Sequence, residues 1–66
     1  MKLEKQLAAF LRAKRGQMTY AEFSKKVGLP PSTLHRLEMC DQSITLSRLE
    51  LILRRLKCSV KEIFPD

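Results

Sequence analysis

The chain has 66 residues, which leaves room for one domain with a thin core and makes a deep catalytic cleft uncommon. Thirteen Lys and Arg outnumber seven Asp and Glu, and the charge of +6 attracts polyanions such as nucleic acids, though also anionic membranes and acidic proteins. There is no apolar leader and no stretch near the roughly 20 apolar residues that cross a bilayer, so we expect a cytoplasmic protein without a membrane span.

Helical periodicity predicts a first helix at residues 2–15, which Gly16 would end as a C-cap. Its apolar residues recur at helical spacing and should face the core. They are Leu3, Leu7, Phe10 and Leu11.

A second helix is predicted at residues 19–27. Thr19 and Glu22 form a capping box, in which the hydroxyl accepts from the Glu22 N–H and the carboxylate accepts from the Thr19 N–H. Phe23 and Val27 should then face inward. Gly28 ends the helix, because a residue without Cβ takes a positive φ at little cost.

The third predicted helix covers residues 31–39 and begins at Pro31, since proline suits the first helical position. Ser32 is a competing N-cap, and Leu34 and Leu37 form the buried side.

Residues 40–44 are expected to form a loop before a fourth helix at residues 45–57, capped by Thr45 or by Ser47. The apolar stripe of that helix contains Leu46, Leu49, Ile52, Leu53 and Leu56. A further capping box, formed by Ser59 and Glu62, opens a short fifth helix at residues 60–64.

The second and third predicted helices are short and are joined by a tight connection through Gly28, the arrangement of a helix-turn-helix. In such a unit the later helix lies in the DNA major groove, and its first turns contact base edges. The exposed positions there can pair with bases or phosphates or touch a thymine methyl group. These candidate contacts are Pro31, Ser32, Thr33, His35 and Arg36.

A family resemblance rests on a set of segments that occur in a fixed order and spacing. They are Leu11-Arg12, Met18-Thr19-Tyr20-Ala21-Glu22-Phe23-Ser24, Gly28-Leu29-Pro30-Pro31-Ser32-Thr33-Leu34-His35-Arg36-Leu37-Glu38, Thr45-Leu46, Leu49 and Leu56-Lys57-Cys58-Ser59-Val60-Lys61-Glu62-Ile63-Phe64. Through them nearly the whole chain resembles the lambda-repressor-like, or Xre/Cro-type, helix-turn-helix family. The resemblance implies a compact five-helix, all-α domain over residues 1–66 and a transcriptional regulator, here expected to be a repressor that binds double-stranded DNA as a homodimer.

The resemblance also implies roles for residues outside the third helix. The family's ion pair between the first and third helices maps to Arg12 and Glu38, which we expect to be structural. Tyr20 stands where the family usually carries Gln, and its hydroxyl could hold a phosphate at the helix N-terminus. Thr19, Gln42 and Ser43 are further candidates for DNA contact.

The segment after Glu38 departs from the family, which usually has Asn-Gly and a basic residue there. Cys40 must adopt a conformation that glycine takes more cheaply, and Asp41 would repel a phosphate. These departures keep open an alternative, a protein-interaction module on the same fold such as an antitoxin that binds a toxin, or an adaptor. Apolar residues near the end, Val60, Ile63 and Phe64, are the candidate dimer surface.

Catalysis is not expected from this composition. Cys40 and Cys58 fit no zinc-ligand spacing and should be free thiols, and His35 is the only histidine. We therefore expect no metal, no cofactor and no enzymatic activity.

Overall fold

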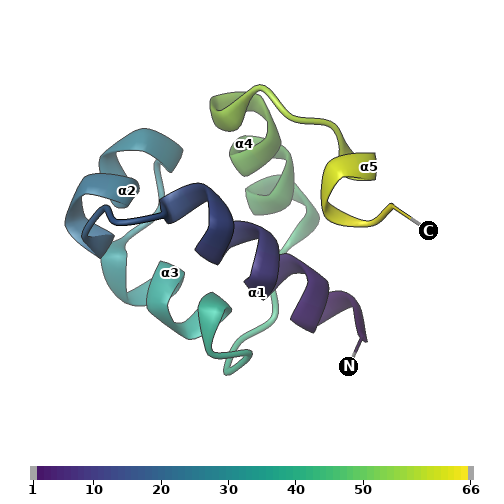
Figure 1. Ribbon diagram of the computed structural model, residues 1–66, viewed down its shortest axis with the longest axis horizontal. Coiled ribbons are helices and arrows are strands. Elements are labelled where there is room, and N and C mark those ends of the chain that lie inside the picture. The colour runs from purple at the N-terminus through teal and green to yellow at the C-terminus, as the bar shows by residue number, and fades with distance from the viewer. Residues whose placement is uncertain (1, 66) are drawn as a thin grey trace.

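A computed structural model describes residues 2–65 and contains five α-helices with no strand among those residues. They are α1 (Lys2–Arg15), α2 (Tyr20–Val27), α3 (Pro31–Glu38), α4 (Leu46–Leu56) and α5 (Val60–Ile63) (Figure 1). The predicted all-α, five-helix fold is confirmed. Five predicted boundaries differ, at residues 19, 39, 45, 57 and 64, and each falls one residue outside the observed helix.

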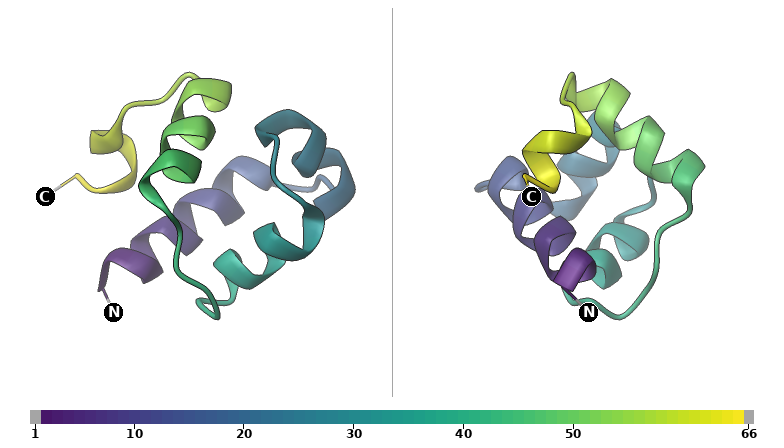
Figure 2. Two further views of the ribbon diagram at one scale, coloured as in Figure 1. Left: turned by 180° about the vertical axis from the view of Figure 1, so that it is seen from behind. Right: turned by 90° about the vertical axis from the view of Figure 1, so that its right-hand side faces the viewer.

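Helix α1 crosses the middle of the molecule and packs against both α3 and α5, while α2 packs against α3 and α4. Seen from the front and from behind, α2 and α3 lie at one end of the molecule and α5 lies at the opposite end (Figures 1 and 2). The helix-turn-helix of α2 and α3 therefore forms one end of the fold, where α3 packs against α1.

One apolar cluster holds the five helices together. Phe23, Leu11, Leu34, Ile52 and Val27 are its largest fully buried side chains, and they come from four different helices. Burying a large apolar side chain contributes about 1.5–3 kcal/mol, so in a chain of 66 residues each of these contacts matters to the fold.

Two leucines that the helical pattern placed in the core are exposed. Leu3 is 59% exposed and Leu46 is 84% exposed. Each lies in the first turn of its helix, beyond the point where a neighbouring helix covers that face, so periodicity alone assigned them wrongly. Ile63 differs in the opposite direction. It was a candidate for the dimer surface, but its side chain is buried at 3% exposure and is not available to a dimer partner.

The ends of α2 follow the prediction. The Thr19 hydroxyl accepts from the Glu22 N–H at 3.1 Å, and the Glu22 carboxylate accepts from the Thr19 N–H at 2.8 Å. At the other end Gly28 has a φ of 83°, in the left-handed region, and its N–H donates to the Ser24 carbonyl at 2.8 Å. This turn sets the direction in which the chain enters α3.

We expect Gly28→Ala to lower the free energy of unfolding by about 1–2 kcal/mol, the usual cost of an L-residue in the left-handed region. An added Cβ would lie 3.4 Å from Leu51 Cδ2 and 3.6 Å from Arg55 Cζ, which are ordinary contacts, so conformation and not crowding sets the cost. Gly28→Asn should therefore cost less, because Asn tolerates a positive φ. Urea denaturation measures the free energy of unfolding of both variants. An equal loss in Gly28→Asn and Gly28→Ala would contradict the conclusion that backbone conformation sets the cost.

The caps of α3 and α4 resolve two alternatives. Pro30 occupies the N-cap of α3 and Ser32 lies inside the helix, whereas Thr45 caps α4 by accepting from the Arg48 N–H at 3.2 Å. Ser47 lies inside α4 and does not cap it. At α5 the Glu62 carboxylate accepts from the Ser59 N–H at 2.9 Å, as the capping-box prediction requires of that residue.

Within residues 2–65, two residues other than glycine adopt the left-handed conformation that favours glycine. Cys40, which follows α3, has a φ of 59° and Lys57, which ends α4, has a φ of 56°. The expectation for Cys40 is confirmed. Both cysteines are free thiols, Cys40 exposed and Cys58 half-buried, as predicted.

Candidate nucleic-acid interface

Helix α3 has one buried side and one exposed side. Leu34, Leu37 and Glu38 are buried and fix the helix against α1 and α2. On the other side Pro31, Ser32, His35 and Arg36 are all exposed, and we call these four residues the outer face of α3. Thr33 is half-buried and lies at the edge of that face. The structure therefore brings together the residues that the sequence proposed for contact with bases.

The N-terminus of α3 is open to an anion. Its N-cap is Pro30, which makes no side-chain cap hydrogen bond, and its first turn carries no acidic residue. The first N–H groups of a helix lack partners within the helix and lie at the positive end of its dipole, which favours phosphate. At α2, by contrast, the Glu22 carboxylate already lies at the N-terminus. Of the two helices, α3 thus has the more favourable terminus for a phosphate.

A buried carboxylate ties α3 to α1. Glu38 is 2% exposed, and Arg15 contacts it through two hydrogen bonds, Nε to Oε2 at 2.8 Å and Nη2 to Oε1 at 3.1 Å. The Tyr20 hydroxyl donates to the same Oε1 at 3.0 Å. We call Glu38, Arg15, Tyr20 and Arg12 the Glu38 network.

The predicted ion pair between Arg12 and Glu38 is present, but it is not the main contact of the Glu38 carboxylate. Arg12 Nε lies 4.0 Å from Glu38 Oε1, at the limit of an ion pair, and Arg12 Nη2 donates instead to the Glu38 backbone carbonyl at 3.0 Å. The short, bidentate contact comes from Arg15, whose Nη1 also donates to the Met18 carbonyl at 3.0 Å. Arg12 and Arg15 share one side of α1, and the sequence does not say which of them the turn before α2 brings to Glu38.

Tyr20 is part of this network, and that corrects the expectation for its hydroxyl. Because the hydroxyl donates to Glu38, it is not free to donate to a phosphate. The Arg15 guanidinium carbon lies 4.3 Å from the centre of the Tyr20 ring, and the ring meets the His35 imidazole edge to face, with centroids 5.3 Å apart and planes at 85°. No signal in the sequence pairs these two aromatic rings, since they lie on different helices.

The phenol of Tyr20 should make stability depend on alkaline pH. Burial, then the hydrogen bond to Glu38 and the charge of that carboxylate, raises the pKa of Tyr20 above its usual value of 10.0. A raised pKa means that the stabilisation is complete below about pH 10 and is lost as the pH rises through the shifted value. We expect the wild type to lose stability relative to Tyr20→Phe only above about pH 10. Urea unfolding of both proteins across the alkaline range tests this, and parallel curves would contradict it.

Thr19, Gln42 and Ser43 were also proposed for DNA contact. Thr19 is exposed at the start of α2, and its hydroxyl accepts from Glu22, which leaves its proton available to a phosphate. Gln42 and Ser43 lie beyond the C-terminal end of α3, away from Pro31 and Ser32. There they line an apolar groove with a cavity volume of about 450 Å³, which we call the groove. Its exposed apolar residues are Leu3, Leu46 and Val60, and the half-buried Phe64 and Ile44 line it as well.

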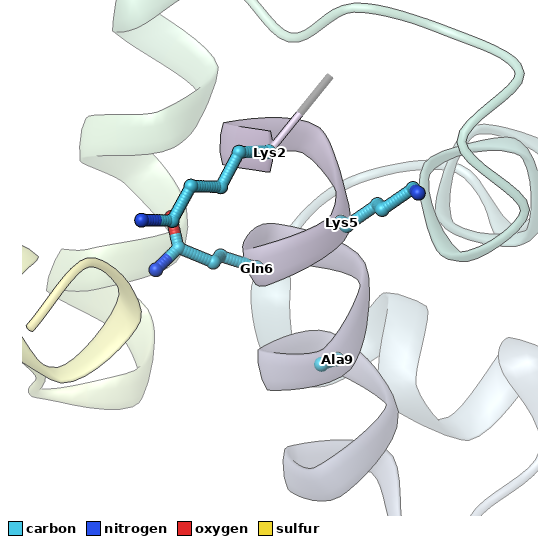
Figure 3. A pocket seen from close by; sticks show the side chains of 4 residues that line it. All are labelled: Lys2, Lys5, Gln6 and Ala9. Atoms are coloured by element: carbon cyan, nitrogen blue, oxygen red, sulfur yellow. The ribbon is translucent and has the colours of Figure 1, made fainter.

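A second depression lies on the surface of α1. Lys2, Lys5, Gln6 and Ala9 line it, with the side chains of Lys2 and Gln6 side by side and that of Lys5 pointing away (Figure 3). All four residues belong to α1 alone, so this is a shallow surface and not a cleft between elements. Over residues 2–65 the structure contains no group of His, Cys, Asp and Glu that could hold a metal ion. No helix within the same range is long and apolar enough to cross a membrane.

Comparison with known proteins agrees with the geometry of α2 and α3. The sequence model for the Cro/C1-type HTH DNA-binding domain matches residues 10–65, which include α2, the turn through Gly28 and α3. No curated protein and no solved structure matched the chain in the corresponding searches. Proteins of this family are typically not enzymes. The fold, the helix-turn-helix and the match over most of the sequence show that the chain belongs to the Cro/C1-type helix-turn-helix DNA-binding domains.

Proposed function

We propose that the chain is a sequence-specific regulator that binds double-stranded DNA in the cytoplasm with the outer face of α3 in the major groove. The observation that carries this proposal is the two-sided construction of α3. Leu34, Leu37 and Glu38 fix its buried side, while Ser32, His35 and Arg36 are exposed on the other. A rigid helix with an exposed, polar and basic surface can present side chains to base edges without first reorganising.

The charge of the chain supports the same proposal. At +6 it attracts DNA at long range, and each phosphate that a Lys or Arg neutralises adds to the salt dependence of binding. Ser32 and Thr33 at the open N-terminus of α3, with Thr19 at α2, are the proposed phosphate contacts. Arg36 and His35 are the proposed base contacts, because both can donate to the purine acceptors in the major groove.

The dimer is proposed to form through the groove and not through Ile63. Leu46, Leu3 and Val60 are 84%, 59% and 49% exposed, and all three line the groove with Phe64. A second copy that packs on this surface would remove these apolar side chains from water. A two-fold dimer places its α3 helices about 34 Å apart, one turn of DNA, and a domain of this kind would repress by occupying its site.

Selection of bound sequences from a random duplex pool tests the proposed function. We expect a short motif to be enriched, repeated with inverted symmetry at a spacing of about one helical turn. Enrichment of a motif in a single copy would still support sequence-specific binding to DNA but would contradict the proposed homodimer. Failure to enrich any motif, with binding that does not fall as salt rises, would contradict the proposal and favour a protein partner such as a toxin.

A further inference from the structure

We infer that Tyr20 is a positioning residue that orients the imidazole of His35, and that these two residues together set the preference for a purine at one base pair of the DNA site. The inference rests on the proposed function, because it needs the outer face of α3 to meet DNA. It starts from the edge-to-face contact between the two rings, with centroids 5.3 Å apart.

The ring of Tyr20 is itself fixed. Its hydroxyl donates to the buried Glu38 carboxylate at 3.0 Å, and the Arg15 guanidinium lies over its face at 4.3 Å. Arg15 is in turn held by its two hydrogen bonds to Glu38. A ring that is bonded at its hydroxyl and covered on its face has little freedom to rotate, so it is a rigid support for whatever it contacts.

The Tyr20 ring contacts His35, whose side chain is exposed to solvent. Ser32 lies three residues before His35 and four before Arg36, and these two spacings put both residues beside Ser32 on the exposed side of α3. An exposed histidine normally exchanges between rotamers and loses that freedom when it binds a ligand. Contact with Tyr20 orders the imidazole in the free protein, so less entropy is lost on binding and one orientation is favoured.

The chemistry of the ring indicates what His35 contacts. A neutral imidazole carries one N–H donor, and in the major groove both purines present N7 as an acceptor, with O6 beside it in guanine. A donor held at the position of N7 meets an acceptor only in a purine, because a pyrimidine presents its C5 edge there, which carries the methyl group in thymine, while the O4 acceptor of thymine lies elsewhere in the groove. The Tyr20–His35 pair therefore favours a purine, while a freely rotating His35 would discriminate less.

Three variants separate positioning from folding. Tyr20→Phe keeps the ring against His35 and removes only the hydroxyl, and Tyr20→Leu removes the ring. His35→Ala removes the imidazole that is proposed to contact the base. We expect wild type to prefer a purine by about fivefold or more at one base pair of the selected motif, in the range of a single mismatch. Tyr20→Phe keeps the ring beneath Arg15 but loses its bond to Glu38, so its preference should lie between those of wild type and Tyr20→Leu. Tyr20→Leu and His35→Ala should both lower that preference to about twofold or less at the same base pair, with the rest of the motif retained. The double variant with Tyr20→Leu and His35→Ala should have the same base preference as His35→Ala alone, because Tyr20 acts on the base only through His35.

Each result decides the inference. A Tyr20→Leu variant with the wild-type base preference would show that the ring does not position His35, and a His35→Ala variant with an unchanged motif would show that His35 reads no base. If wild type enriches no motif, the proposed function fails, which is a different result from an unchanged motif in the variants. If Tyr20→Leu does not fold, nuclear Overhauser contacts between the two rings in wild type bound to its duplex answer the question. We expect them to persist in the complex, and their loss on binding would overturn the inference.

Discussion

Replacing Glu38 with alanine is expected to lower the free energy of unfolding by about 2–3 kcal/mol. Removing one partner of a buried ion pair usually costs about 3–5 kcal/mol, because the other charge is left without compensation. Here the main partner, Arg15, retains 20% exposure of its side chain and can turn partly toward water, which reduces the cost. The Tyr20 hydroxyl loses its acceptor as well. Since a domain of this size has about 3–10 kcal/mol of stability in total, the loss would be a large part of it.

An exposed ion pair in the same molecule provides the matched control. Glu50 and Arg54 lie one helical turn apart on α4, 3.4 Å between Oε1 and Nη2, with side chains 72% and 71% exposed. Glu50→Ala should cost no more than about 0.5 kcal/mol, because exposed pairs contribute little. Urea denaturation of both variants at neutral pH makes the comparison. Losses of equal size would mean that the Glu38 network does not hold α3 in place.

Replacing Arg36 with alanine is expected to weaken binding to the selected duplex by about 1–3 kcal/mol, which is roughly 5-fold to 150-fold. Arg36 is exposed on the outer face of α3, and its planar guanidinium can donate two hydrogen bonds to guanine O6 and N7. If it reads a base, the variant should also lose the preference for that base pair. If it contacts a phosphate, binding should weaken equally for all sequences and the salt dependence should fall by about one unit.

Lys61→Ala is the control for charge alone. It also removes one positive charge, but from α5, which packs on α1 at the end of the molecule away from α3 (Figure 1). Its effect should be small and should vanish as salt rises, because only the long-range field is changed. Mobility shifts over a series of salt concentrations compare the two variants. Equal losses for Arg36→Ala and Lys61→Ala would remove Arg36 from the interface.

Local features of the fold were predictable because their causes are local. The capping box at Thr19, the left-handed turn at Gly28 and the start of α3 at Pro31 each depend on a few neighbouring residues, and all three are present. The strain at Cys40 was predictable for the same reason. These features were enough to identify the helix-turn-helix and the exposed side of α3.

Features that depend on several helices at once were not predictable. Leu46 has the spacing of a core residue, but the first turn of α4 has no helix over it, so the residue is exposed. Arg12 and Arg15 are equivalent in pattern, and only the path of the chain from α1 to α2 brings Arg15 to Glu38. The contact between Tyr20 and His35 likewise exists only once α2 and α3 are packed.

Chemical-shift mapping of the folded protein with its selected duplex tests the position of α3 most directly. Adding the duplex should shift the amide and side-chain signals of Ser32, His35 and Arg36 most, with smaller changes near Thr19 at the start of α2. Signals of the groove residues around Leu46 should respond less than these, and only through the proposed dimer contact. Changes that centre on the groove, or that leave the signals of the outer face of α3 unmoved, would contradict the proposal that this helix enters DNA.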